Sequence, residues 1–120
     1  MRKTAKLVAT AASVVTLLGT LVLAPVTTTV AASAVEQGKK LTFNKKKGNC
    51  LACHKIAGGK LAGNIGPPLF GMKRLTKKQL KAQIWDATKK NPNSSMPPFG
   101  KHKILSEGDI DKIVEFVHTL

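Results

Sequence analysis

The chain has 120 residues, and its 20 lysines and arginines against 6 aspartates and glutamates give it a formal net charge of +14. Such a basic chain could bind nucleic acid, but lysine far outnumbers arginine, which base and phosphate recognition favour, and no nucleic-acid motif is present. The sequence contains only 2 cysteines, which excludes a zinc site built from four thiolates.

The first 34 residues have the pattern of a secretory signal peptide. Three basic residues at the N-terminus precede the uncharged apolar stretch 7–23, and the small residues 32–34 form a signal-peptidase site. The alternative is a retained membrane anchor, because an apolar stretch of about 17 residues is near the lower limit for a span. The Ala-x-Ala site favours cleavage. We therefore expect export to the periplasm, a mature chain that begins near Val35, and no stable membrane span.

The remainder, residues 35–120, has the length of one small domain. A domain of this size buries little surface and usually needs a further constraint, which a covalently held cofactor can supply. No stretch has the pattern of a strand. The first helical pattern covers about residues 35–46, with Gly38 and Leu41 among its inward positions. We expect an all-α domain.

The residues from Cys50 to His54 have the spacing Cys-x-x-Cys-His. Two thiols at this spacing can bond to the two vinyl groups of one porphyrin, and the adjacent imidazole can reach the iron from the same side. The motif therefore predicts a haem c attached through Cys50 and Cys53, with His54 as an axial ligand of the iron.

Two other types of site use a Cys-x-x-Cys pair. A thioredoxin-like redox pair follows a strand, whereas the lysine-rich residues 45–47 precede this motif. A zinc site would need His102 or His118 as a further ligand, and neither has the spacing of a zinc finger. Both alternatives are less well supported than haem attachment.

A Gly-Pro-Pro-Leu sequence, residues 66–69, follows the Cys-x-x-Cys-His motif. Proline has a free carbonyl oxygen and no amide hydrogen. Pro67 can therefore accept a hydrogen bond from the second ring nitrogen of His54 and fix the orientation of the imidazole. Taken alone, the sequence would indicate only a turn.

The second helical pattern begins with a capping box formed by Thr76 and Gln79. Its apolar positions continue at helical spacing until Asn91 and Pro92, where we expect the helix to end. Trp85, the only tryptophan, is expected to pack under this helix rather than to contact a haem propionate.

The loop after this helix contains the best candidate for a sixth iron ligand. Met96 precedes Pro97 and Pro98, and prolines stiffen the backbone that must hold a long side chain at the iron. We expect Met72 to fill the core and the two remaining histidines to lie at the surface or at a helix end. Ligation by His54 and Met96 predicts a low-spin, six-coordinate iron with a raised reduction potential.

The third helical pattern is the clearest of the three. Ser106 precedes Asp109 by three positions in an N-terminal cap, and apolar residues then repeat at helical spacing over residues 110–117. Acidic residues in the first turn suit the positive end of the helix dipole.

Taken together, the helix, Cys-x-x-Cys-His, Gly-Pro-x-Leu, the Met-Pro loop and the final helix resemble class I cytochrome c. Three blocks of the sequence make the resemblance more specific than class I cytochrome c in general. They are residues 48–54, residues 63–69, and residues 91–92 with 96–100. They are similar to the SoxX subunit of the bacterial sulfur-oxidation system. The resemblance covers the whole mature chain and implies a small all-α fold of helices packed around one covalently attached haem.

The resemblance implies a periplasmic electron-transfer protein that forms a heterodimer with a SoxA-like cytochrome and passes electrons to a downstream redox acceptor. In that family the complex couples thiosulfate oxidatively to a cysteine of a carrier protein, and the catalytic haem belongs to SoxA. This chain would be the non-catalytic subunit of an L-cysteine S-thiosulfotransferase-type complex. Both of its thiols, Cys50 and Cys53, are assigned to the haem. Its shortness and heavy lysine content set it apart from longer family members.

Two other functions fit the same motifs. One is a free-standing cytochrome c that diffuses between respiratory partners, and the other, less favoured, is a haem sensor or enzyme with an open iron site. Lysines flank the haem motif and the methionine loop, which suggests a positive rim at the haem edge that steers acidic partners. The rim residues are Lys45, Lys46, Lys47, Lys55, Lys101 and Lys103.

Overall fold

The computed structural model describes residues 27–120, so the greater part of the expected signal peptide lies outside the described residues. This part of the chain contains the helices α1 (Thr27–Phe43), α2 (Lys77–Trp85) and α3 (Glu107–Val117). Short 3₁₀ turns lie between them: η1 (Cys50–Ala52), η2 (Met72–Arg74) and η3 (Ala87–Lys89). Within residues 27–120, β-type pairing is limited to a bridge between Ile56 and Leu69, which confirms the all-α fold.

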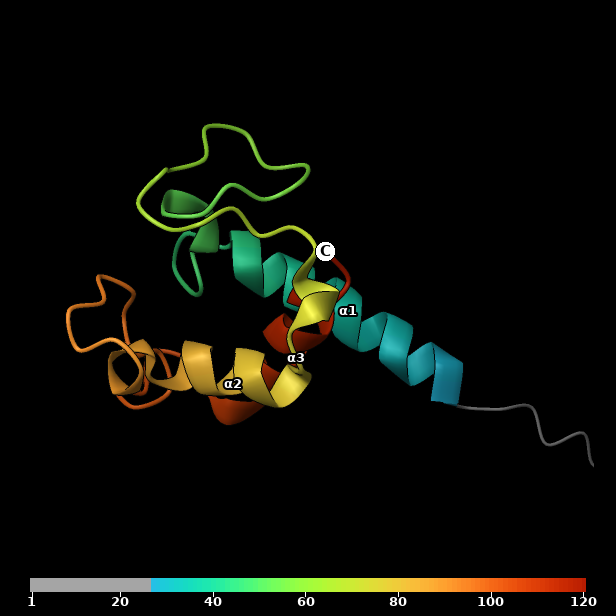
Figure 1. Cartoon of the computed structure of the whole chain (residues 1–120). Coiled ribbons are helices and arrows are strands. Elements are labelled where there is room, and N and C mark those ends of the chain that lie inside the picture. Colours follow the sequence, from blue (N-terminus) through green and yellow to red (C-terminus); the bar gives the residue numbers. More distant parts are fainter. Residues whose placement is uncertain (1–26) are drawn as a thin grey trace, which may run out of the picture.

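The helices form the centre of the domain and the long loops lie toward one end (Figure 1). α3 contacts both α1 and α2. The amide of Gly71 donates to the carbonyl of Leu120 at 2.7 Å, which ties the C-terminus to η2. No helix between residues 27 and 120 is both long enough and apolar enough to span a membrane.

α1 differs in its limits from the helix expected over residues 35–46. It begins at Thr27 and ends at Phe43, so the expected cleavage position after Ala34 lies inside it. Asn44 causes the early end: its side-chain oxygen accepts from the amide of Lys46 at 2.8 Å, and a local bond of this kind competes with helical hydrogen bonding.

The inward face of α1 packs closely against α3. A Cβ atom on Gly38 would stand 1.8 Å from the carbonyl oxygen of Lys112, so only glycine permits this approach of the two backbones. Thr42, one turn later, is fully buried, and its hydroxyl donates to the carbonyl of Gly38 at 2.8 Å. The inward positions expected for Gly38 and Leu41 agree with their burial and half-burial.

The caps expected for the other two helices are present. Thr76 accepts from the amide of Gln79 while the Gln79 side chain accepts from the amide of Thr76, which is a complete capping box. Ser106 accepts from the amide of Asp109 at 3.1 Å at the start of α3.

α2 is shorter than expected, because it ends at Trp85 and not at Asn91. The backbone of Asp86 leaves the helical region, and its side chain accepts from the amide of Thr88, which caps the separate turn η3. An Asp at such a position offers the backbone an alternative to continued helix. The expected single helix is therefore a helix followed by a distinct turn.

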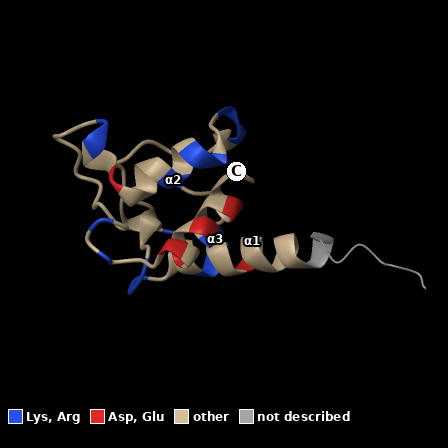
Figure 2. Cartoon of the chain, turned by 90° about the horizontal axis from the view of Figure 1, so that it is seen from below, with Lys and Arg blue, Asp and Glu red and all other residues tan. Residues whose placement is uncertain are grey.

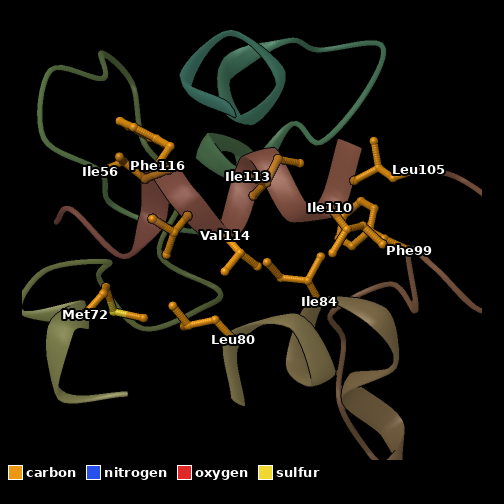
Figure 3. Close-up of a cluster of buried hydrophobic side chains, with 11 residues drawn as sticks. Ile56, Met72, Leu80, Ile84, Phe99, Leu105, Ile110, Ile113, Val114 and Phe116 are labelled. Atoms are coloured by element: carbon orange, nitrogen blue, oxygen red, sulfur yellow. The ribbon is translucent and has the colours of Figure 1, made fainter. Parts of the chain in front are cut away.

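The core lies along α3, with apolar side chains from α2 and the loops packed against it (Figure 3). Ile110 and Ile113 are essentially inaccessible to solvent. Phe116 meets Phe43 of α1 with ring centroids 6.2 Å apart. Met72 is buried in the same cluster, which confirms its expected place in the core.

Candidate haem-binding site

The Cys-x-x-Cys-His residues form a tight turn that is separated from the end of α1 by residues 44–49. Asn49 adopts a left-handed backbone with φ of 47°, and η1 then brings the amide of His54 to the carbonyl of Cys50 at 2.9 Å. Cys50 and Cys53 are both free thiols. Burial raises the pKa of Cys50 to about 11, so this thiol is protonated at neutral pH.

His54 is oriented by the Gly-Pro sequence that follows it. Its Nδ1 atom lies 2.7 Å from the carbonyl oxygen of Pro67. A carbonyl oxygen can only accept, so Nδ1 carries the hydrogen and the lone pair of Nε2 is free for a metal. The hydrogen bond expected between His54 and Pro67 is thus present.

Gly66 provides the room for this orientation. A Cβ atom at this position would stand 2.4 Å from Cε1 of His54 and 2.6 Å from its Nδ1, so the ring lies directly against the glycine. The amide of Gly66 also donates to the carbonyl of Cys53 at 2.9 Å. The sequence places Gly66 in the Gly-Pro-Pro-Leu sequence but does not predict its contact with the ring.

The loop between the two sequences is fastened onto the cysteine turn. The amide of Gly63 donates to the carbonyl of Leu51 at 2.9 Å, and a Cβ on Gly63 would meet the carbonyl oxygen of Ala52 at 1.8 Å. Gly63, like Gly66, is required because there is no room for a side chain, and not because its backbone adopts a positive φ. The glycine-rich composition of the loop was the available signal for both contacts.

Met96 lies on the loop between η3 and α3. Its side chain is half-buried and packs against the edge of the core, and its amide donates to the hydroxyl of Ser94 at 3.2 Å. This loop and the cysteine turn lie toward the same end of the molecule (Figure 1). The other candidates are placed differently: Met72 is in the core, His102 is exposed in a turn, and His118 caps the end of α3.

Trp85 does not lie under α2 as expected. It is the last residue of the helix and is 38% exposed, with its ring against the backbone of Gly100. The shortened α2 explains the difference, because the tryptophan stands at a helix end and not in the middle of a longer helix.

Carboxylates are confined to a few positions of the molecule. Each of the 6 acidic residues forms an ion pair with a lysine, and residues 37–85 contain none of them. Figure 2 shows the acidic positions on or beside the helices, and lysines and arginines both on the loops and on α2. Two of the expected rim lysines are among those paired: Lys47 with Asp109 at 3.8 Å and Lys101 with Asp86 at 3.1 Å.

The residues present fit a haem c. Two free thiols stand three positions apart in a turn, and an imidazole beside them is held by Nδ1 so that Nε2 is free. The half-buried thioether of Met96 lies on the loop between η3 and α3. Thiols, imidazole and thioether are the groups that attach and ligate haem in c-type cytochromes.

The fold and this set of residues define the class of protein: a cytochrome c, whose general function is electron transfer with a haem c cofactor. Residues 33–117 match the model of the family described as cytochrome c oxidase, cbb3-type, subunit III. The chain belongs to this family. The match decides against the thioredoxin-like and zinc-site interpretations of the cysteine pair.

The individual proteins that are similar to the chain include a bacterial lipoprotein and a solved cytochrome complex. An uncharacterized lipoprotein of Aquifex aeolicus (strain VF5) is 40% identical over 84 residues, which are 68% of this chain and 40% of the relative. The chain thus spans less than half the length of this relative. A chain of the crystal structure of SoxXA from P. pantotrophus matches with a TM-score of 0.64 and 28% identity, over 70% of this chain and 79% of that one. The resemblance to SoxX-like cytochromes is confirmed.

Proposed function

We propose that the chain is the electron-transferring X subunit of a SoxAX-type complex in thiosulfate oxidation. The observation that supports this proposal is the likeness to SoxXA in both fold and sequence, at a TM-score of 0.64 and 28% identity. The partner would be a SoxA-like cytochrome in a heterodimer, which would pass electrons through this chain to a downstream redox acceptor.

In this proposal the cysteine turn holds one haem c. Cys50 and Cys53 would attach the group covalently, His54 and Met96 would ligate its iron, and Pro67 would fix the ring of His54. When bound, the haem supplies a one-electron couple. The chain's own contribution is to orient the imidazole, to keep small molecules from the iron with the Met96 side chain, and to favour the reduced state through the thioether.

The sulfur chemistry is assigned to the partner. Oxidative coupling of thiosulfate to a cysteine of a carrier protein needs a reactive site, and both thiols of this chain are committed to the haem in the proposal. The chain is therefore proposed as a non-catalytic subunit of an L-cysteine S-thiosulfotransferase-type complex.

We further propose that residues 1–34 direct export to the periplasm and are removed there. This proposal is supported by the charge and apolar pattern of the segment and by its small-residue site. Intact-mass measurement of the protein from a periplasmic extract tests it: a mature chain should begin near Val35. A full-length mass in the membrane fraction would instead indicate a retained anchor.

Copurification is the test of the Sox assignment. The tagged chain, isolated from thiosulfate-grown cells, should bring down a SoxA-like cytochrome in equal amount. Finding the chain alone under these conditions would contradict the proposal. That result would favour the alternative, a free-standing cytochrome c that carries electrons between respiratory partners.

A further inference from the structure

The loop that contains Met96 is closed at its base by three successive residues, Trp85 to Ala87. At its start, the amide of Asn91 donates to the carbonyl of Ala87 at 3.1 Å. At its end, the amides of Gly100 and Lys101 both donate to the carbonyl of Trp85, each at 3.2 Å. Both ends of the loop thus meet at one point of the chain, the junction between α2 and η3.

Packing of the Trp85 ring reinforces the end of the loop. Gly100 is buried, and a Cβ atom there would stand 2.3 Å from Cδ2 and Cε3 of the indole. Gly100 is not among the glycines with positive φ, so its backbone suits any residue and the requirement is one of space. The indole therefore determines how closely the loop approaches α2.

An ion pair adds a second connection at the same place. Asp86 is only 7% exposed, and its Oδ2 lies 3.1 Å from Nζ of Lys101. Its other oxygen accepts from the amide of Thr88 at 3.1 Å. A buried carboxylate needs such partners, so movement of Lys101 would leave a buried charge less well compensated.

Within the loop, the hydrogen bonds are local, while Phe99 is buried in the core and Met96 packs partly against it. The amide of Ser94 donates to the carbonyl of Asn91 at 2.9 Å, and Met96 donates to the hydroxyl of Ser94. Pro97 and Pro98 restrict the backbone that follows. The position of Met96 therefore depends on the base of the loop together with this packing against the core.

We propose that Trp85, Asp86, Gly100 and Lys101 form a clamp that positions the Met96 side chain as an axial ligand. The proposal rests on the proposed ligation by Met96. A thioether is a weak ligand, and the entropy of a loose loop opposes its binding, so restraint of the loop in advance favours the bound state. The four residues act on the ligand through the loop and need not touch the cofactor. Attachment through the cysteine turn, which has its own restraints, should not depend on them.

The first test is Gly100→Ala in the haem-loaded full chain. Crowding against the indole should displace the end of the loop and lower the ratio of Met96-bound to detached molecules, on the order of tenfold to a hundredfold. The ferric absorption band that methionine ligation gives near the red end of the visible spectrum should weaken, and the reduction potential should fall. Gly108→Ala is the matched control, because a Cβ there meets nothing within 4 Å.

Two further variants separate positioning from general destabilisation. In a Trp85→Leu background the indole is gone, so adding Gly100→Ala should weaken the band less than it does in the wild type. Lys101→Met should also weaken the band, whereas Lys40→Met, which removes the exposed pair with Glu36, should leave it intact. Ile113→Val lowers stability in the core away from the loop and should retain the band.

The outcomes distinguish failure of the proposed clamp from failure of the proposed ligation by Met96. A wild-type ferric protein that lacks the band, or keeps it in Met96→Ala, overturns ligation by Met96 and the clamp with it. A band that is lost in Met96→Ala but unchanged in both Gly100→Ala and Lys101→Met overturns the clamp alone. Equal losses in Gly100→Ala and Ile113→Val would also overturn it, because they would reflect stability and not position.

Discussion

At the scale of single residues, the geometry of His54 depends on a neighbour that has no side chain. The imidazole is held between the Pro67 carbonyl and Gly66, with the ring so close to the glycine that a Cβ would stand 2.4 Å from it. A hydrogen bond from Nδ1 to a carbonyl increases the electron donation of the other nitrogen to a metal. Gly66 therefore influences the proposed iron site without contacting the cofactor.

We predict that Gly66→Ala displaces the ring of His54 and lengthens its hydrogen bond to Pro67. The imidazole then donates less to the iron, so the reduction potential should rise, and overpacking should lower the free energy of unfolding by about 1–3 kcal/mol. Potentiometric titration and denaturant unfolding measure the two effects. Gly108→Ala should leave the reduction potential unchanged and should not lower the stability, since its Cβ points into open space. A wild-type potential in Gly66→Ala would contradict this role of the glycine.

At the scale of elements, the sequence predicts features that depend on residues a few positions apart, such as helix caps. It does not predict contacts between residues that are distant along the chain. The caps at Thr76 and Ser106 follow from side chains three positions apart, and both are present. The break of α2 at Asp86 also has a local signal, an Asp two positions before a Thr, but the helical pattern on both sides outweighed it. The contact between Trp85 and Gly100 joins residues fifteen positions apart, so only the folded structure reveals it.

The same difference between local and long-range contacts determines how much of the haem-binding site could be predicted. The pairing of His54 with Pro67 could be predicted because Pro67 lies between the haem motif and the methionine loop and has a free carbonyl oxygen that can accept. The sequence shows the glycines around these two residues, but it does not predict which atoms the glycines approach. The greater length of α1 has a different cause: the small-residue site predicts a signal boundary at Ala34, whereas helical hydrogen bonding continues across it.

Asp86 terminates α2 and caps η3, so its ionisation affects how these elements join. Hydrogen bonds from Thr88, together with the ion pair to Lys101, lower the pKa of Asp86. A carboxyl whose pKa is lower in the folded state contributes stability above its unfolded pKa of about 3.9, and this contribution is lost as the pH falls through the folded value.

We therefore predict that the free energy of unfolding of the wild type falls more steeply with acidification below about pH 4 than that of Asp86→Asn. Denaturant titrations at a series of pH values measure the difference. Asp111→Asn is a suitable comparison, because this carboxylate also pairs with a lysine but is 53% exposed. Parallel stability curves for the wild type and Asp86→Asn would show that the carboxylate has no such role.

At the scale of the whole molecule, the ion pairs determine where the positive charge is available. All 6 carboxylates are matched with lysines, and two of the expected rim lysines, Lys47 and Lys101, are partly neutralised in this way. The rim is therefore reduced to Lys45, Lys46, Lys55 and Lys103, for which no carboxylate lies within ion-pair distance in the described part of the chain. Residues 37–85 contain no carboxylate, but α3 brings Asp109 close to the cysteine turn, where it pairs with Lys47.

We predict that electron transfer to an acidic redox protein, with a flavodoxin as the probe, slows steeply with salt. Raising the ionic strength from about 10 mM to 150 mM shortens the Debye length from roughly 30 to 8 Å, so long-range attraction is screened and the association rate should fall on the order of tenfold. Stopped-flow kinetics measure this rate. Lys46→Gln, beside the cysteine turn, should reduce both the rate and its salt dependence more than Lys78→Gln, which removes an equally exposed charge on α2. If the two variants had equal effects, net charge and not the rim would govern association; a rate that does not change with salt would exclude electrostatic steering altogether.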